Sequence, residues 1–258
     1  MKPSNSERRL WVAMLLLPMI AGGCETVRAP RAHDRPGFRV LTYNVNHGLP
    51  QPDLACDALL KADADIVCLQ ETTREWERRL RERLSKRYPH MIFRETENHC
   101  AGGLAFLSKQ PGELVEQVHS PSGWFDACIG KFQTVAGPVQ VLNVHLRPPV
   151  SNRGSVVSGY FTTSDDRQRE IEHFWKHCQR DVPTLAVGDF NENEDDRATR
   201  WLARQGMTNA LALHDPDSPT WRWPTPLLAT AREVYSAAVK ELDPNADFCG
   251  VYQWYAKK

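Results

Sequence analysis

The sequence lacks several features that would assign it to a protein class directly. Lys plus Arg and Asp plus Glu both number 32 among the 258 residues, so the formal net charge is zero. Without a positive field over the whole chain, tight nonspecific binding of nucleic acid by counterion release is disfavoured, and only a local basic patch would restore it. The six cysteines after Cys24 include no C-x-x-C pair and no metal-knuckle spacing, so a zinc site is not indicated.

The N-terminal hydrophobic run is too short for a transmembrane helix. The run from Leu10 to Ile20 has 11 residues, whereas a helix across the bilayer needs roughly 20. It follows Arg8 and Arg9 and precedes small residues that end at Cys24, an arrangement typical of a secretory signal peptide. We therefore expect residues 1–24 to be a signal peptide.

The end of this segment, Ile20-Ala21-Gly22-Gly23-Cys24, resembles the lipobox of bacterial lipoproteins. The resemblance implies that Cys24 becomes the lipidated first residue of the mature protein, and that Glu25 directs sorting to the outer membrane. The alternative is an ordinary cleaved signal in which Cys24 has no role. The lipoprotein interpretation predicts a bacterial cell-envelope protein, lipid-anchored at the periplasmic face of the outer membrane.

Residues 25–36 are polar and contain prolines, which favours a tether between the membrane and a folded domain. Residues 37–258 suit one domain, which we expect to be monomeric. The contents of 41% hydrophobic and 25% charged residues are those of a globular protein with a core. In an oxidising compartment, Cys100 and Cys128 are candidates for a disulfide, because they lie at the ends of a strand-turn-strand stretch.

The hydrophobic pattern predicts alternating strands and helices. Short runs rich in β-branched and aromatic residues predict buried strands at Phe38–Val45, Ala64–Leu69, Val139–Leu146 and Thr184–Phe190. Turn signals place two more strands at Gly102–Leu107 and Cys128–Thr134. Apolar residues at helical spacing predict amphipathic helices at Thr73–Lys86 and Asp165–Arg180. Helices interleaved with strand pairs favour an α/β sandwich with layered sheets and outer helices.

Each of the four strong strands ends in polar residues. The first ends with Asn44, and the second is followed by Glu71. The third contains Asn143-Val144-His145, in which the period of two places the amide and the imidazole on one face. The fourth runs into Gly188-Asp189-Phe190-Asn191. Strand ends of this kind that converge would form a polar cleft.

These side chains suit the hydrolysis of phosphate esters. A carboxylate such as Glu71, with an oxygen donor from Asn44, suits a hard cation such as Mg²⁺, which usually takes one or two protein carboxylates and keeps waters. Asp189 can orient or deprotonate a water molecule. Asn191 and His145 can hold phosphoryl oxygens and stabilise the charge of the transition state.

The ordered motifs Thr42-Tyr43-Asn44-Val45, Leu69-Gln70-Glu71-Thr72, Asn143-Val144-His145-Leu146 and Gly188-Asp189-Phe190-Asn191 resemble those of the endonuclease/exonuclease/phosphatase superfamily, which includes DNase I-like nucleases and phosphatases. The resemblance implies a four-layered α/β sandwich of two mixed, mainly antiparallel sheets. It also implies a phosphoesterase that uses Mg²⁺, Mn²⁺ or Ca²⁺. By the same resemblance, Glu71 is the chief metal ligand with Asn44 beside it, and His145, Asp189 and Asn191 are catalytic.

Three further residues are candidates for substrate binding: Asn143, Arg167 and Thr220. Arg167 opens the helix of residues 165–180 and could contact substrate phosphate, with a solvated helix charge as the alternative. Thr220 lies in Pro219-Thr220-Trp221, which resembles a late loop that lines the family's site. His47, close behind Asn44, is expected to be a surface histidine.

The C-terminal part departs from the family pattern from about residue 230. Family members normally end with an Arg-Ile-Asp-like strand and a Ser-Asp-His strand end, and neither is found here, where the last histidine is His214. A frameshifted or truncated ending, a transfer of the role to another residue such as Asp243 or Asp247, and a loss of catalysis are the three explanations. The first is favoured because the tail lacks a strand pattern, and missing strands would leave a sheet edge open.

Three functions remain open at this point. The first is a phosphoesterase, which could be a phosphodiesterase, a nuclease or a phosphatase acting on nucleic acid, nucleotides or lipid head groups. The second is a catalytically impaired lipoprotein that binds a metal or a phosphoester in the same cleft. The third is a structural envelope protein, which ranks last because four polar strand ends would then be buried at a cost of roughly 1–3 kcal/mol for each unsatisfied group.

Overall fold

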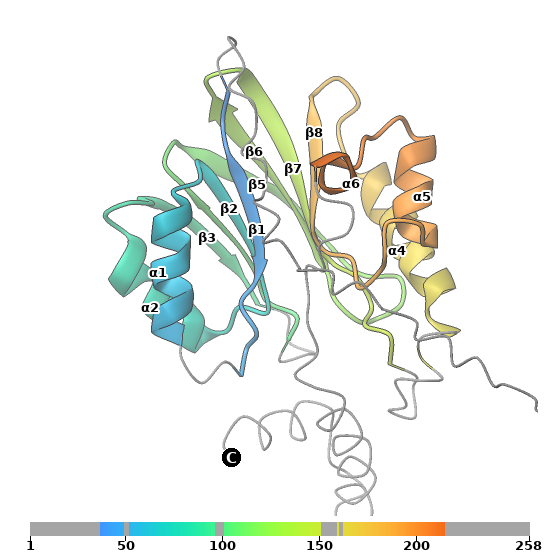
Figure 1. Cartoon of the computed structure of the whole chain (residues 1–258), viewed down its shortest axis with the longest axis horizontal. Coiled ribbons are helices and arrows are strands. Elements are labelled where there is room, and N and C mark those ends of the chain that lie inside the picture. The colour runs from blue at the N-terminus through green and yellow to red at the C-terminus, as the bar shows by residue number, and fades with distance from the viewer. Residues whose placement is uncertain (1–36, 49–51, 96–100, 151–158, 160–161, 215–258) are drawn as a thin grey trace, which may run out of the picture. The chain divides into compact units, whose positions relative to one another are not determined.

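Two four-stranded β-sheets form the centre of the computed structural model (Figure 1). The structure describes residues 37–48, 52–95, 101–150, 159 and 162–214. All of them belong to the unit formed by residues 31–258. Cys24, Cys100, Thr220 and the atypical tail lie outside the described residues, so the predictions made for the signal peptide, the tether and the ending remain predictions.

The first sheet has the strand order β1-β2-β4-β3. Its strands are β1 (Val40–Asn44), β2 (Ile66–Gln70), β4 (Leu104–Ser108) and β3 (His90–Arg94). β1 and β2 run parallel, with Asn44 opposite Gln70, while the other two pairs are antiparallel. Both parallel strands therefore bring their carboxyl ends to the same edge of the sheet.

The second sheet has the order β5-β6-β7-β8 and a similar plan. Its strands are β5 (Gly112–Val118), β6 (Ala127–Thr134), β7 (Gly137–His145) and β8 (Thr184–Asp189). Here β7 and β8 are the parallel pair, with His145 opposite Asp189, and the others are antiparallel. Among the described residues, β1 and β8 are edge strands, and the two are in contact.

The strand period of two divides the core of the first sheet into two layers. Val67 and Leu69 of β2 face outward into a cluster with helices α1 (Pro52–Ala62) and α2 (Arg74–Leu84). Ile66 and Cys68 face the second sheet, in a middle cluster that includes the edge-to-face pair Phe106 and Phe132. Burial in this middle layer holds the two sheets together.

The second sheet is covered on its outer face by two helices. Ile171 and Phe174 of α4 (Ser164–Lys176) and Leu202 of α5 (Arg197–Arg204) pack against Leu142 and Val144 of β7. A short helix α6 (Ala210–His214) ends the described part of the chain. The order helix, sheet, sheet, helix confirms the predicted four-layered α/β sandwich with mixed, mainly antiparallel sheets.

All six predicted strands and both predicted helices are present, with ends that differ by a few residues. Trp76, Leu80 and Leu84 are the buried stripe of α2, as their spacing predicted. The sequence analysis missed two strands, β3 and β5, and three helices, α1, α5 and α6. β5 was missed because it begins at Gly112, and the pair Pro111-Gly112 was interpreted only as a turn.

The predicted disulfide between Cys100 and Cys128 is wrong. Cys128 is a free thiol buried in the middle layer, where burial raises its pKa to about 12. Cys56, Cys68 and Cys178 are likewise free and buried. These four cysteines therefore act as small apolar core residues.

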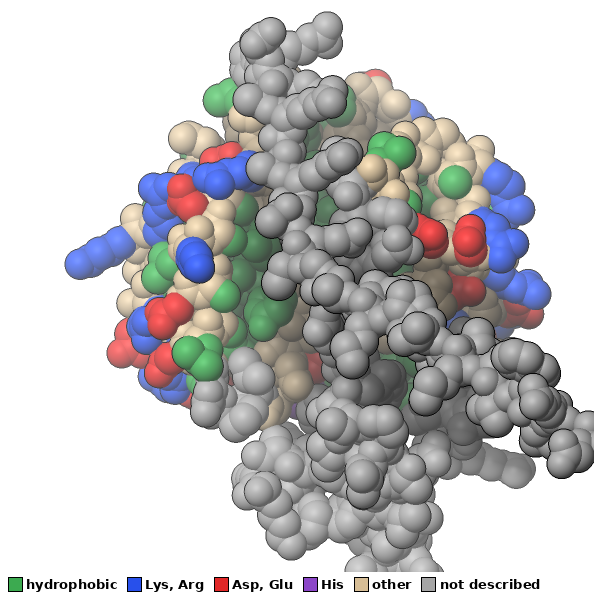
Figure 2. Space-filling model, in the orientation of Figure 1, with side chains coloured by type: hydrophobic (Ala, Val, Ile, Leu, Met, Phe, Trp, Pro, Cys, Tyr) green, Lys and Arg blue, Asp and Glu red, His purple; other side chains and the backbone are tan. Residues whose placement is uncertain are grey.

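Charges of both signs are mixed over the face of the domain in Figure 2. On α2, Arg79 pairs with Asp53 and Arg83 pairs with Asp57, so the arginine-rich helix is bonded to acidic residues of α1. This mixing agrees with the absence of net charge. In the described part of the chain, none of the helices combines the length and the apolar character needed to cross a bilayer.

Candidate active site

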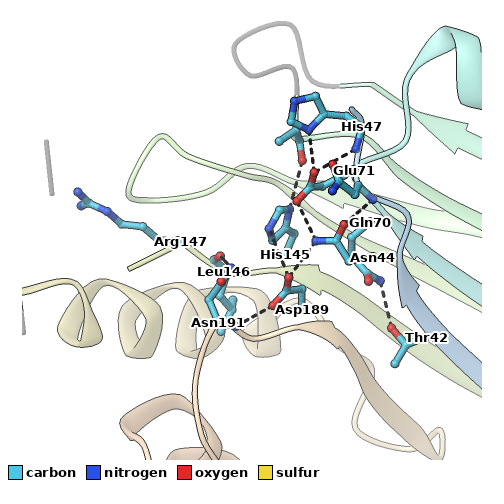
Figure 3. A network of polar contacts seen from close by, with 12 residues as sticks. Thr42, Asn44, His47, Gln70, Glu71, His145, Leu146, Arg147, Asp189 and Asn191 are labelled. Carbon is cyan, nitrogen blue, oxygen red and sulfur yellow. Dashed lines mark hydrogen bonds and ion pairs between the residues drawn. The ribbon is translucent and has the colours of Figure 1, made fainter. Parts of the chain in front are cut away.

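The site lies where the carboxyl ends of the two parallel strand pairs meet. Asn44 ends β1 and Glu71 follows β2 in the first sheet, while His145 ends β7 and Asp189 ends β8 in the second. Contacts between β8 and both β1 and β2 bring the two sets together. Figure 3 shows these four side chains pointing toward one another from the two sheets.

Asn44 connects the two carboxylates of the site. Its Nδ2 donates to Glu71 Oε1 at 2.8 Å and to Asp189 Oδ2 at 2.9 Å. Its Oδ1 accepts the backbone N–H of Asn46 at 2.9 Å, which fixes the orientation of the amide. The structure therefore directs the amide nitrogen of Asn44 to the carboxylates, whereas the predicted role as a metal ligand would use the amide oxygen.

Glu71 is held by several donors and remains in reach of solvent. Its Oε2 accepts the backbone N–H of His47 at 3.2 Å and contacts His47 Nδ1 at 2.7 Å. Burial by itself raises the pKa of this carboxyl, but the His47 hydrogen bond, the charge of His145 and the Asn44 hydrogen bond together lower it to about 2. Its side chain is 16% exposed. Glu71 is thus an anion at the mouth of the site.

His47 is not the surface histidine that the sequence analysis expected. Its side chain is only 3% exposed, and it lies against Glu71. The loop after β1 makes a tight turn at Asn46, which has a φ of 54°, and this turn brings the imidazole back over the end of β2. Position in a short polar loop suggested exposure, but the partner of the ring is 24 residues away in the sequence.

Asp189 and Asn191 are set by the turn after β8. Asp189 Oδ1 accepts the backbone N–H of Asn191, which has a φ of 50°. The Asn191 amide nitrogen donates to Leu146 O at 2.9 Å. Gly188 has a φ of 138°, and a Cβ there would lie 1.9 Å from Val144 O, so only glycine fits this approach of β8 to β7.

His145 lies between the first sheet and Asp189. Its Nδ1 lies 3.2 Å from Ala101 O, and since a carbonyl only accepts, Nδ1 carries the proton. Its Nε2 faces Asp189 Oδ2 at 3.9 Å. Phe125 stacks on the ring with 4.1 Å between the ring centres. The imidazole is therefore fixed with one nitrogen directed toward the carboxylates.

Asn143 lies beneath the site, on the same face of β7 as His145. It is fully buried, and its Nδ2 donates to Leu69 O and Ala105 O in the first sheet. Its Oδ1 accepts Gln70 Nε2 at 2.7 Å. The amide thus bonds the two sheets together, and its contact with substrate remains a prediction.

Arg167 lies behind the site, within the protein. Its Nε donates to Glu192 Oε1 at 3.0 Å, in an ion pair whose two side chains are 3% and 0% exposed. Its Nη1 donates to Thr163 Oγ1 and Arg147 O. The alternative of a solvated helix charge is wrong, because Arg167 is buried. These bonds give the guanidinium a structural role, and contact with substrate phosphate remains a prediction.

The donor set fits a hard divalent cation that keeps water ligands. Glu71 and Asp189 share one amide donor, so their oxygens lie close together at a partly exposed position. No cluster of three or more His, Cys, Asp and Glu residues suited to a metal exists within the described ranges. A closed zinc-type site is thus not formed there, while one or two carboxylates with waters are what Mg²⁺ commonly uses.

The sequence analysis named the main polar side chains but missed their supports, which are His47, Gln70 and Phe125. Gln70 was quoted in a motif without a role, although a polar residue inside an apolar strand was a usable signal. His47 and Phe125 carried no such signal, because their contacts with Glu71 and His145 exist only in the folded chain.

Comparison with known proteins agrees with this geometry. The sequence model of the Endonuclease/Exonuclease/phosphatase family matches residues 41–234, which include all four strand-end motifs. Members of this family hydrolyse phosphate esters with divalent metals. The sequence matches none of the curated proteins with which it was compared.

Several solved structures share the fold at low sequence identity. The human Nocturnin catalytic domain with bound sulfate is 17% identical, with a TM-score of 0.56 over 72% of this chain and 78% of that one. An AP endonuclease from Archaeoglobus fulgidus is 15% identical, with a TM-score of 0.55 over 76% and 82%. A Staphylococcus aureus beta toxin mutant with bound magnesium ions is 15% identical, with a TM-score of 0.51 over 67% and 71%.

Proposed function

The chain belongs to the endonuclease/exonuclease/phosphatase family, and we propose that it is a Mg²⁺-dependent hydrolase of phosphate esters. The observation that carries the proposal is the amide of Asn44, which lies within 3 Å of both Glu71 and Asp189. Two carboxylates from different sheets are thereby held at one partly exposed point. Such a point can receive a hard cation and a phosphate together.

Glu71 would hold the cation, with waters and substrate oxygens completing the coordination. When bound, Mg²⁺ supplies a positive charge that polarises the phosphoryl group. The low pKa of Glu71 favours this role, because the carboxylate is ionised at all physiological pH values. Asn44 would align the two carboxylates through its Nδ2.

The remaining side chains would act on the water and the phosphoryl group. Asp189 would orient the attacking water and take its proton as the water oxygen bonds to phosphorus and the ester P–O bond breaks. With its ring doubly protonated, His145 would donate from Nε2, beside Asp189, to a phosphoryl oxygen, and the second N–H of the Asn191 amide would donate to another as negative charge develops. The leaving alcohol takes up a proton from solvent.

The test is hydrolysis of bis(p-nitrophenyl) phosphate, p-nitrophenyl phosphate and plasmid DNA by the purified protein with and without Mg²⁺. We expect hydrolysis of at least one of them with Mg²⁺, none with EDTA, and losses of about 10²-fold or more in Glu71→Ala and in Asp189→Ala. Glu82→Ala, which removes an exposed carboxylate on α2, is the control. Turnover that survives both site substitutions would refute the assignment.

The same experiment separates the alternative of a catalytically impaired binding protein. A protein of that kind would bind Mg²⁺ in calorimetry and show no turnover on any of the three substrates. The substrate class follows from which substrate is cleaved, since nucleic acid, nucleotides and lipid head groups all fit the neutral net charge.

We also propose that the protein is a monomer anchored to the cell envelope through a lipid on Cys24, facing the periplasm at the outer membrane. The support is the arrangement of Arg8-Arg9, the short apolar run and Cys24. Labelling of cells with a palmitate analogue should mark the wild-type protein and not Cys24→Ser. Equal labelling of both, or release of the wild-type protein as a soluble form, would contradict the anchor.

A further inference from the structure

His47 leaves Glu71 with one unfilled acceptor position. A carboxylate offers about four lone pairs on its two oxygens. On Oε2, two are used by the backbone N–H and the ring Nδ1 of His47, at 3.2 Å and 2.7 Å. On Oε1, one is used by Asn44 Nδ2 at 2.8 Å. The remaining lone pair therefore belongs to Oε1, whose amide donor also bonds Asp189.

The geometry of the loop fixes His47 in this position. Asn46 N–H is bonded to Asn44 Oδ1, and Gly48 N–H is bonded to Asn46 Oδ1. Trp76 Nε1, on α2, donates to Asn46 O at 3.3 Å. The loop is thus tied to β1 and to α2, and the imidazole has little freedom to leave Glu71.

We propose that His47 is a positioning residue that restricts Glu71 to binding a cation through Oε1 alone, and so makes the site prefer Mg²⁺ to Ca²⁺. Mg²⁺ demands a compact octahedral shell and commonly takes one oxygen from a carboxylate. Ca²⁺ accepts six to eight oxygens and often takes both oxygens of one carboxylate. An Oε2 that is saturated by His47 excludes the second mode. The proposal rests on the cation site of the proposed function.

Two substitutions at the same position separate the donor from the volume of the side chain. Because an ionised carboxylate only accepts, His47 Nδ1 must be the donor in its bond with Glu71. The amide nitrogen of asparagine lies at about the place of Nδ1, whereas that of glutamine lies at about the place of Nε2. His47→Asn should therefore keep the bond to Oε2, and His47→Gln should lose it.

The experiment is isothermal titration calorimetry of the full chain with Mg²⁺ and with Ca²⁺, on the wild type and both variants. The wild type should bind Mg²⁺ more tightly than Ca²⁺. In His47→Gln the ratio of Mg²⁺ to Ca²⁺ affinity should fall by about 10-fold to 100-fold, the size of effects seen when a group that orients a metal ligand is removed. His47→Asn should stay within a few-fold of the wild type. A purely structural role would lower both affinities together and leave the ratio unchanged.

Thermal melting checks that each variant is folded. If His47→Gln does not fold, His47→Phe replaces it, because phenylalanine keeps a ring and has no donor. The proposal is overturned if the ratio of Mg²⁺ to Ca²⁺ affinity is unchanged in the variant without the donor. It is also overturned if that ratio falls as much in His47→Asn as in the variant without the donor. If the wild type binds Mg²⁺ but the affinity ratio is unchanged in the variants, the role of His47 is refuted and the proposed function is not. Wild-type protein that binds neither cation overturns both.

Discussion

Two carboxylates, the partly exposed Glu71 in the site and the buried Glu170 on α4, differ in the direction of their pKa shifts although each accepts three hydrogen bonds. Glu71 accepts two from His47 and one from Asn44. Glu170 accepts from the hydroxyls of Ser120 and Ser122 and from the backbone N–H of Arg147. The pKa of Glu71 is lowered to about 2, whereas the pKa of Glu170 is raised above its ordinary value.

The difference comes from the hydrogen-bond donors and the charges around the two groups. Burial raises both pKa values, but His145 and His47 oppose it at Glu71, whereas Asp166 adds to it at Glu170. At Glu71 the hydrogen bonds from His47 and Asn44 and the charges of His145 and His47 together outweigh burial, whereas at Glu170 burial outweighs the three hydrogen bonds. Glu71 is an anion that solvent can reach, whereas Glu170 is fully buried and bonds neighbouring segments of the chain to α4.

The largest expected effect follows from replacing each carboxyl by an amide of the same shape. Glu71→Gln should lower kcat/KM for phosphate ester hydrolysis by about 10³-fold, because it removes the negative charge that would hold the cation. Glu170→Gln should leave kcat/KM within a few-fold of the wild type, since Glu170 has no contact with the site's carboxylates. Steady-state kinetics over a range of Mg²⁺ concentrations measures both. Equal losses in the two variants would contradict the distinction.

The second prediction concerns the buried ion pair between the guanidinium of Arg167 and the carboxylate of Glu192. Arg167 is the partner of Glu192, whose pKa is raised mainly by burial even with the guanidinium present. Arg167→Met should cost about 3 kcal/mol of unfolding free energy, because it leaves a buried acid without its partner.

Urea denaturation measures this loss, and the double variant Arg167→Met/Glu192→Gln should recover a large part of it. If Arg167 contacts substrate phosphate instead, the double variant would recover stability while KM stays raised. A stable single variant would show that the buried pair contributes little to the fold.

The smallest expected effect is the dependence of stability on pH, and its sign differs between the two groups. The lowered pKa of Glu71 contributes stability that is present above its ordinary value of about 4.3 and is lost as the pH falls through about 2. The raised pKa of Glu170 contributes stability that is present below about 4.3 and is lost as the pH rises through its value in the folded protein.

Urea denaturation with EDTA at a series of pH values tests both signs. Glu71→Gln should flatten the loss of stability between about pH 4.3 and 2, by about 1–2 kcal/mol. Glu170→Gln should flatten the change above about pH 4.3 instead. The reverse assignment of the two windows would show that the neighbouring charges do not set these pKa values.

Much of the fold could be predicted because its signals are local. The alternation of Ile66, Val67, Cys68 and Leu69 places successive residues in the middle and outer layers, and the sequence already contains this alternation. The helix of Trp76, Leu80 and Leu84 is predictable for the same reason. β3, whose residues are only partly buried, gave too weak a pattern to be found.

The sequence predicted which residues belong to the candidate site, but it did not predict their hydrogen-bond partners. Asn44, Glu71, His145 and Asp189 stand out as polar residues at the ends of apolar strands. Which atom of Asn44 faces the carboxylates depends on the Asn46 N–H, and the environment of Arg167 depends on Glu192, 25 residues away. The failed disulfide has the same origin, since Cys128 is directed into the middle layer by the parity of β6.

By itself, the sequence determined the layers and the order of the strand-end motifs, because periodicity and strand-end polarity are properties of short segments. Only the tertiary structure decided that His47 lies against Glu71, that Asn143 bonds the two sheets and that Arg167 is an internal ion pair. The physical reason is that hydrogen-bond partners and pKa values depend on groups brought together from distant parts of the chain, and these groups meet only when both sheets are packed.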